Sequence, residues 1–120
     1  MRRVVEGLLS VKNSLSGGGK DYIVRVIEAP DYRIINVCDE EVFGLTLKEK
    51  DLEIHISKEF YGGERVGEEE LMELLRNASI INLTGRRCVD LAVSRGFAHK
   101  DAVKKVKNVS FLMIFKFMRG

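Results

Sequence analysis

The order of the short apolar segments after residue 21 is the feature that most limits which fold this chain can adopt. Segments rich in β-branched residues predict strands. Two other segments carry apolar residues at helical spacing and predict helices. The predicted strands are 22–28, 33–38, 52–57, 80–83 and 109–117, and the predicted helices are 68–77 and 86–95. The order β-β-β-α-β-α-β predicts an α/β (α+β) fold, in which two main helices pack on a mixed β-sheet.

The first 20 residues differ from the rest of the chain. Apolar residues recur near helical spacing in residues 3–15, and the sequence SGGG at 16–19 ends regular structure. We therefore expect an N-terminal leader over residues 1–20, with a short helix and a glycine-rich linker. Residues 21–120 are expected to form a single compact domain, which is an ordinary domain size.

Composition excludes several classes of protein. No apolar run approaches the roughly 20 residues that a membrane-spanning helix needs, and we expect a cytoplasmic protein. The chain has no Gln and no Trp, and 32% of its residues are charged. That composition fits a heat-adapted protein.

The two Cys and two His are isolated in sequence, so neither a metal site nor a cofactor is predicted. Cys38 and Cys88 are interpreted as buried thiols, with a disulfide between them as the open alternative.

Charge is distributed unevenly along the chain. Residues 1–20 carry a formal charge of +3, residues 21–75 carry −9, and residues 76–120 carry +8. A strongly basic last third can act as an electrostatic footprint for a phosphate-rich partner. Alternatively, the acidic and basic segments neutralise one another across the folded surface. The sequence leaves both interpretations open.

Three short motifs resemble one archaeal protein family. They are CDEE at residues 38–41 followed by Gly44, FYGG at 60–63, which is interpreted as a turn with the wall of a pocket as the alternative, and INLTG at 81–85. Together they resemble the archaeal domain of unknown function 424, over roughly 80 to 90 residues. The resemblance implies an α/β domain of an archaeal protein and no known reaction.

Two features depart from the family's pattern. The family usually ends with a segment that contains Pro and His, whereas residues 108–112 here read NVSFL. A role that needs that His is therefore not expected in this chain. The leader before Tyr22 also has no counterpart in the family.

The best candidate site is the turn Leu83-Thr84-Gly85-Arg86-Arg87. A buried strand that enters a helix through a small turn leaves free backbone N–H groups at that turn. These groups, the helix dipole and two Arg side chains suit a phosphate. The alternative is an ordinary helix cap with two solvated arginines.

Further basic residues follow this turn and extend the predicted phosphate-binding or RNA-binding surface: Lys100, Lys104, Lys105, Lys107, Lys116 and Arg119. Phe111, Phe115 and Phe117 lie among them in sequence and can stack on bases. Packing in the core is the competing interpretation for these aromatic residues.

Cys38, Asp39 and His55 are the weak candidates for catalysis. A thiol at the end of a strand can act as a nucleophile, with His55 or His99 approaching it in space. The adjacent carboxylates, however, raise a thiol pKa and make the thiol less reactive. We therefore predict no catalytic residue and favour a non-enzymatic protein over an enzyme.

Three functions are consistent with these features. The first is a non-enzymatic module that binds RNA or a ribonucleoprotein, with a possible role at the ribosome or in translation. The second is a small-molecule enzyme or nucleotide-binding domain that uses the Thr84-Gly85-Arg86 turn. The third is a protein-interaction subunit joined through residues 1–15 or through the C-terminal strand.

Overall fold

The computed structural model describes residues 21–116, so the predicted leader at 1–20 and the last four residues lie outside the described part. The strands are Tyr22–Glu28 (β1), Arg33–Asp39 (β2), Thr46–Glu49 (β3), Leu52–His55 (β4), Glu64–Val66 (β5), Ile80–Thr84 (β6), Lys104–Val106 (β7) and Val109–Phe115 (β8). The helices are Lys58–Tyr61 (α2), Glu68–Arg76 (α3) and Arg86–Ser94 (α4), with 3₁₀ turns at Glu40–Val42 (η1) and Lys100–Ala102 (η2).

Six strands form one mixed sheet in the order β5-β1-β2-β6-β8-β7. The β2–β6 pair is parallel, with Cys38 opposite Thr84. The other pairs of described strands in this sheet are antiparallel. The mixed α+β prediction is confirmed in this coarse form, but the predicted element order is incomplete. It lacks three strands, β3, β5 and β7, and it assigned a turn where α2 forms.

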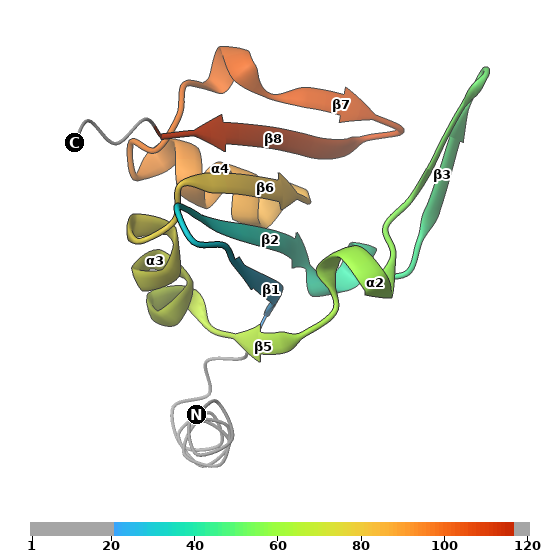
Figure 1. Cartoon of the computed structure of the whole chain (residues 1–120). Helices are drawn as coiled ribbons and strands as arrows, with labels where there is room; N and C mark the ends of the chain where they lie inside the picture. The colour runs from blue at the N-terminus through green and yellow to red at the C-terminus, as the bar shows by residue number, and fades with distance from the viewer. Residues whose placement is uncertain (1–20, 117–120) are drawn as a thin grey trace, which may run out of the picture.

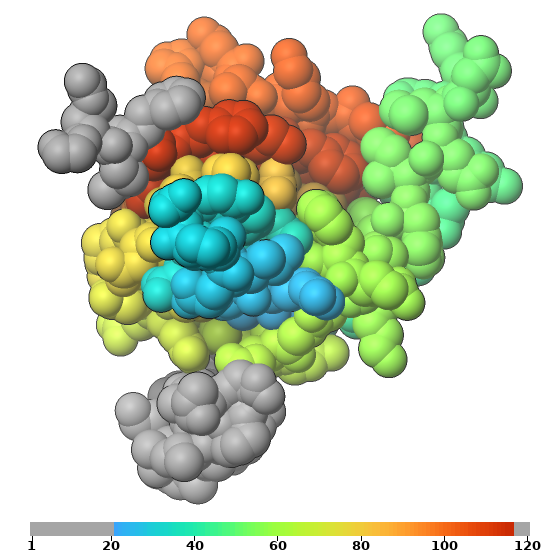
Figure 2. Space-filling model, in the orientation of Figure 1, coloured from blue at the N-terminus to red at the C-terminus, as the bar shows by residue number. Residues whose placement is uncertain are grey.

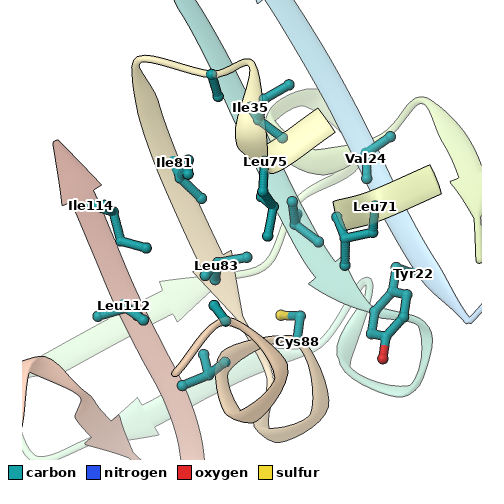
Figure 3. Packing of buried hydrophobic residues seen from close by; sticks show 14 of the residues in the cluster. Tyr22, Val24, Ile35, Leu71, Leu75, Ile81, Leu83, Cys88, Leu112 and Ile114 are labelled. Atoms are coloured by element: carbon teal, nitrogen blue, oxygen red, sulfur yellow. The ribbon is translucent and has the colours of Figure 1, made fainter. Parts of the chain in front are cut away.

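One face of the six-stranded sheet carries the main core. Alternate strand residues point to this face, as the two-residue period of a strand requires. They pack against α3 and α4, and α4 passes behind β6 and β8 in Figure 1. Figure 3 shows the resulting cluster, which includes Ile35, Ile81, Leu83, Leu112 and Ile114 from the strands and Leu71, Leu75 and Cys88 from the helices. Burial of each such aliphatic side chain stabilises the fold by about 1.5–3 kcal/mol.

The opposite face carries no long helix from the described residues, and we call it the open face. A smaller cluster covers one end of it, formed by Ile23, Cys38, Leu47, Ile56 and Tyr61. Leu47 comes from the β3–β4 hairpin, which extends away from the body of the protein (Figure 1). The rest of the open face retains several exposed apolar side chains. No helix within residues 21–116 has the length and apolar character to cross a membrane.

Candidate functional site

Asp39 occupies the helix N-terminus that the sequence assigned to a phosphate. Because β2 and β6 are parallel, their carboxyl ends lie at the same edge of the sheet, and Asp39 reaches the first turn of α4. Its two carboxylate oxygens accept hydrogen bonds from the backbone N–H groups of Arg87, at 2.7 Å, and Cys88, at 2.9 Å. The carboxylate therefore takes the place that sequence analysis gave to an external anion.

Gly85 makes this close approach possible. Its φ of +120° lies in a region that disfavours side chains, and a Cβ there would collide with the Asp39 carboxylate. Asp39 is almost fully buried. Burial raises the pKa of the Asp39 carboxyl, while the two amide hydrogen bonds and the Arg87 guanidinium oppose that rise. Asp39 thus links the end of β2 to the first turn of α4, and its carboxylate fills the anion position at this turn.

Arg87 is also committed to internal partners. Its guanidinium forms a two-point interaction with the Glu41 carboxylate and donates to the backbone carbonyl of Asp21. It also lies over the Tyr22 ring, 5.2 Å from the ring centre. The Arg87 guanidinium holds the pKa of Glu41 down at about 2. Arg86, by contrast, is exposed and forms no ion pair within residues 21–116.

The other predicted basic residues separate into two groups. Lys116 donates from Nζ to the carbonyls of Leu75, at 2.6 Å, and Arg76, at 3.1 Å, and so caps the C-terminus of α3. Arg119 lies outside the described residues. The remaining four are exposed and form no ion pair with an acidic residue among those described: Lys100, Lys104, Lys105 and Lys107.

The candidate catalytic residues are not arranged for chemistry. Cys38 has no exposed surface, and burial beside Asp39 raises the pKa of its thiol to about 12. His55 lies on the β3–β4 hairpin, where its Nδ1 is 2.9 Å from the Thr46 hydroxyl. Cys88 packs in the main core, on the other face of the sheet from Cys38, and both thiols are free. Within residues 21–116, no three His, Cys, Asp or Glu side chains are grouped to hold a metal ion.

A groove of about 470 Å³ lies on the open face and is the best candidate site. Its walls come from α2, β6, β8 and β7 (Figure 1). Figure 2 looks onto this face, where β8 and β6 reach the surface between β7 and the α2 segment. We call it the sheet groove, and its side-chain lining includes Phe60, Tyr61, Asn82, Thr84, Lys104, Phe111 and Met113.

Hydrogen bonds fix the floor of the sheet groove. The hydroxyls of Tyr61 and Thr84 lie 2.6 Å apart and are buried. Beside them, Asn82 donates to Asn36, and Asn36 donates to the backbone carbonyl of Phe60. These contacts join α2 to β2 and β6. Two of the motifs that carry the family resemblance, FYGG and INLTG, therefore meet at this groove, and Cys38 of the third motif lies opposite Thr84 in the β2–β6 pair.

Exposed apolar side chains lie on the open face, with Phe60 and Met113 in the lining of the sheet groove and Phe115 further along β8. The exposed fractions are 45% for Phe60, 57% for Met113 and 55% for Phe115. Strand alternation places Met113 and Phe115 on the open face, because their neighbours Leu112 and Ile114 enter the core. The core-packing interpretation of Phe115 is therefore wrong, and that of Phe111 holds in part, since Phe111 contacts the smaller cluster. Phe117 lies outside the described residues.

Lys104 gives the sheet groove its positive charge. It lies on the edge strand β7 opposite Phe111, whereas its neighbour Lys105 lies opposite Ser110 and points to the other face. Asn82 and Met113 were not predicted as site residues, and for Phe60 a turn was favoured over a pocket wall. The available signal was the strand alternation around Leu112, which leaves Met113 outside the core, but the position of α2 was needed to recognise the groove.

Comparison with known proteins gives a family and a fold. Residues 27–117 match the family described as "Protein of unknown function (DUF424)". A similar solved structure is that of an uncharacterized conserved protein from Methanopyrus kandleri, at 24% sequence identity and a TM-score of 0.65. The similarity covers 82% of this chain and 98% of that one, and it supports the fold. No curated protein matches the chain.

Proposed function

This chain belongs to the DUF424 family, whose description assigns no activity, and we propose that it is a non-enzymatic module that binds single-stranded RNA through the sheet groove. In a cell, the RNA could be free or part of a ribonucleoprotein. The observation that carries the proposal is the cluster of exposed ring and thioether side chains on a sheet face that no long helix of the described residues covers.

Stacking explains why such a face suits unpaired bases. Every base has a flat apolar surface, and proteins bind single strands by placing bases on aromatic side chains. Phe60 and Phe111 come from different elements of the sheet groove, α2 and β8, and Met113 lines it beside Phe111 on β8. The volume of the groove is within the range of small-molecule sites, so it accommodates a base.

Cations at one side of the groove supply the contact to phosphate. Lys104 lines the groove itself, and Lys100 and Lys107 lie close to the two ends of β7 in the chain. Because no described acidic residue pairs with these three lysines, their charge is available to a polyanion. This group replaces Arg87 and Lys116 as the proposed phosphate contacts.

The observations give less support to an enzyme or to a phosphate site at the Thr84 turn. The amides of that turn are taken by Asp39, and the Cys38 thiol is buried with a raised pKa. A protein partner added along the edge of the C-terminal strand is disfavoured at residues 109–111, where β7 already pairs with β8. Residues 112–115 pair with β6 on one side and with no described strand on the other.

A binding measurement with two matched variants tests the proposal. Fluorescence anisotropy would follow the full chain binding a labelled single-stranded RNA of mixed sequence at low salt. Met113→Glu places a negative charge on the open face, and we expect affinity to fall at least about tenfold. Leu52→Glu introduces the same charge at a residue that is 46% exposed on the β3–β4 hairpin, and it should bind as the parent does.

The alternatives give different results in the same measurement. Equal loss in the two variants would show that net charge alone governs binding. If no RNA bound but a nucleoside monophosphate did, the groove would be a small-molecule site. If neither bound and the parent protein self-associated in a Met113-dependent manner, the open face would be a protein interface.

A further inference from the structure

We infer that Asn82 reads the edge of a bound base and makes the sheet groove select bases that carry an exocyclic amine. This inference rests on the proposed function and adds a specificity to it. It follows from the chain of hydrogen bonds that runs from Asn82 through Asn36 to the main chain of α2.

A backbone carbonyl fixes the direction of this chain. Nδ2 of Asn36 lies 3.1 Å from the carbonyl oxygen of Phe60, which can only accept a hydrogen bond. Asn36 must therefore turn its Oδ1 toward Asn82. Nδ2 of Asn82 donates to that oxygen at 2.8 Å. Because Asn36 is only 1% exposed, solvent offers it little alternative, and the orientation is well determined.

The consequence concerns the other end of the Asn82 amide. One N–H of Nδ2 is committed to Asn36, and the carbonyl oxygen Oδ1 is the acceptor of the amide that remains open. No hydrogen bond among residues 21–116 uses this oxygen, and it is not among their buried unpaired atoms. Asn82 lines the sheet groove together with Phe60 and Met113. A base stacked in the groove therefore meets a fixed hydrogen-bond acceptor.

A fixed acceptor distinguishes bases by their donors. Cytosine presents an amine at the position where uracil presents a carbonyl, and the two rings are otherwise nearly the same size. An amine donates to Oδ1 of Asn82, whereas a carbonyl places a second acceptor against it. Cytosine gains one hydrogen bond and avoids leaving an acceptor unpaired, so we expect the groove to prefer cytosine over uracil by about fivefold or more.

Two variants of Asn82 separate recognition from folding. Asn82→Leu keeps a similar volume but removes the amide and leaves Asn36 without its donor. Asn82→Thr supplies a hydroxyl that can donate to Asn36 while removing the carbonyl from the groove, and its β-branched side chain suits a strand. Asn77→Leu is the control, because Asn77 lies at the exposed C-terminal end of α3 and does not line the groove.

The experiment compares oligocytidylate with oligouridylate of equal length, using the full chain and fluorescence anisotropy. We expect the parent and Asn77→Leu to prefer oligocytidylate by about fivefold or more, and both Asn82 variants to bind the two oligomers within about twofold of each other. Circular dichroism would establish that each variant is folded. A preference that persists in Asn82→Thr would overturn the inference, as would a parent that binds both oligomers equally well. Binding to neither oligomer would remove the proposed function itself.

Discussion

At the residue scale, Asp39 shows how an internal group can occupy an apparent ligand site. The turn at residues 83–87 has the small residues and cations of an anion site, and nothing in the local sequence indicates that a carboxylate 48 residues before Arg87 fills it. The parallel pairing of β2 and β6 is what brings Asp39 to α4. The sequence therefore identified the position of a bound negative charge but not its source.

Removal of that carboxylate should destabilise the protein. Asp39→Asn keeps the shape of the side chain but directs one amide N–H toward a backbone N–H of α4, so one hydrogen bond is lost and a second donor is left unpaired. We expect the free energy of unfolding to fall by about 2 kcal/mol in urea denaturation. Asp90→Asn on the exposed side of α4 should change it by less than about 0.5 kcal/mol. Equal effects would show that Asp39 is not the cap.

The Glu41–Arg87 pair should appear in the pH dependence of stability. Because the pKa of folded Glu41 is about 2 and its ordinary value is 4.5, the pair contributes stability above pH 4.5 that is lost as pH falls toward 2. The Glu41 side chain is 56% exposed, so solvent screening limits the contribution to about 1 kcal/mol or less. Glu41→Gln should show a smaller loss of stability over this pH range than the parent.

Chemical denaturation at several pH values provides the measurement. Glu53→Gln is a suitable control, since Glu53 is exposed on β4 and forms no ion pair within the described residues. Burial raises the pKa of Asp39, so its contribution runs in the opposite direction and weakens as pH rises. Comparison with the parent cancels that contribution. An unchanged pH profile in Glu41→Gln would contradict the assignment.

At the element scale, the elements with a buried apolar face were predicted correctly, whereas strands that form mainly by pairing with a neighbouring strand were missed. The strands at 22–28 and 80–84 and the helices at 68–76 and 86–94 were predicted to within one residue at each end. The missed strands β3 and β7 are rich in Lys and Glu, which are depleted in strands. They form because each pairs with a more apolar neighbour in a hairpin. Helix α2 is a single turn, capped by the Ser57 hydroxyl.

The candidate site depended on these missed elements. Lys104 and Phe111 were both candidates in the sequence, but only the pairing of β7 with β8 places them opposite each other. For FYGG at 60–63 the sequence favoured a turn over a pocket wall, whereas Phe60 and Tyr61 belong to α2 and form a wall of the sheet groove. Local periodicity predicts which side chains leave the core, but tertiary packing decides where they gather.

The β7–β8 turn offers a test of the missed hairpin. Lys107 and Asn108 have φ values of 51° and 69°, so both central residues adopt the left-handed conformation of a type I′ turn. Asn108→Gly places at the second position the residue that this turn favours, because glycine has no Cβ to strain there. We expect it to raise the free energy of unfolding by about 0.5–1 kcal/mol. A loss of stability in urea denaturation would contradict the assigned turn.

At the scale of the whole molecule, charge is partly neutralised and partly retained. Arg87 and Arg95 pair with carboxylates of the acidic middle segment, as expected if the acidic and basic segments neutralise one another. The lysines at 100, 104, 105 and 107 form no ion pair among the described residues, as expected if the basic last third is available to a phosphate-rich partner. The fold thus concentrates available positive charge beside a sheet face that retains exposed apolar side chains. That combination is the central claim.

The salt dependence of RNA binding tests this claim most directly. Lys104→Ala and Lys105→Ala remove the same charge from adjacent exposed residues of β7, but only Lys104 lines the sheet groove. We predict that Lys104→Ala weakens binding of single-stranded RNA and reduces the slope of log K against log salt by about 0.7, the value for one phosphate contact. Lys105→Ala should retain the parent's affinity and slope. Equal slopes in the two variants, or binding insensitive to salt in the parent, would contradict the account.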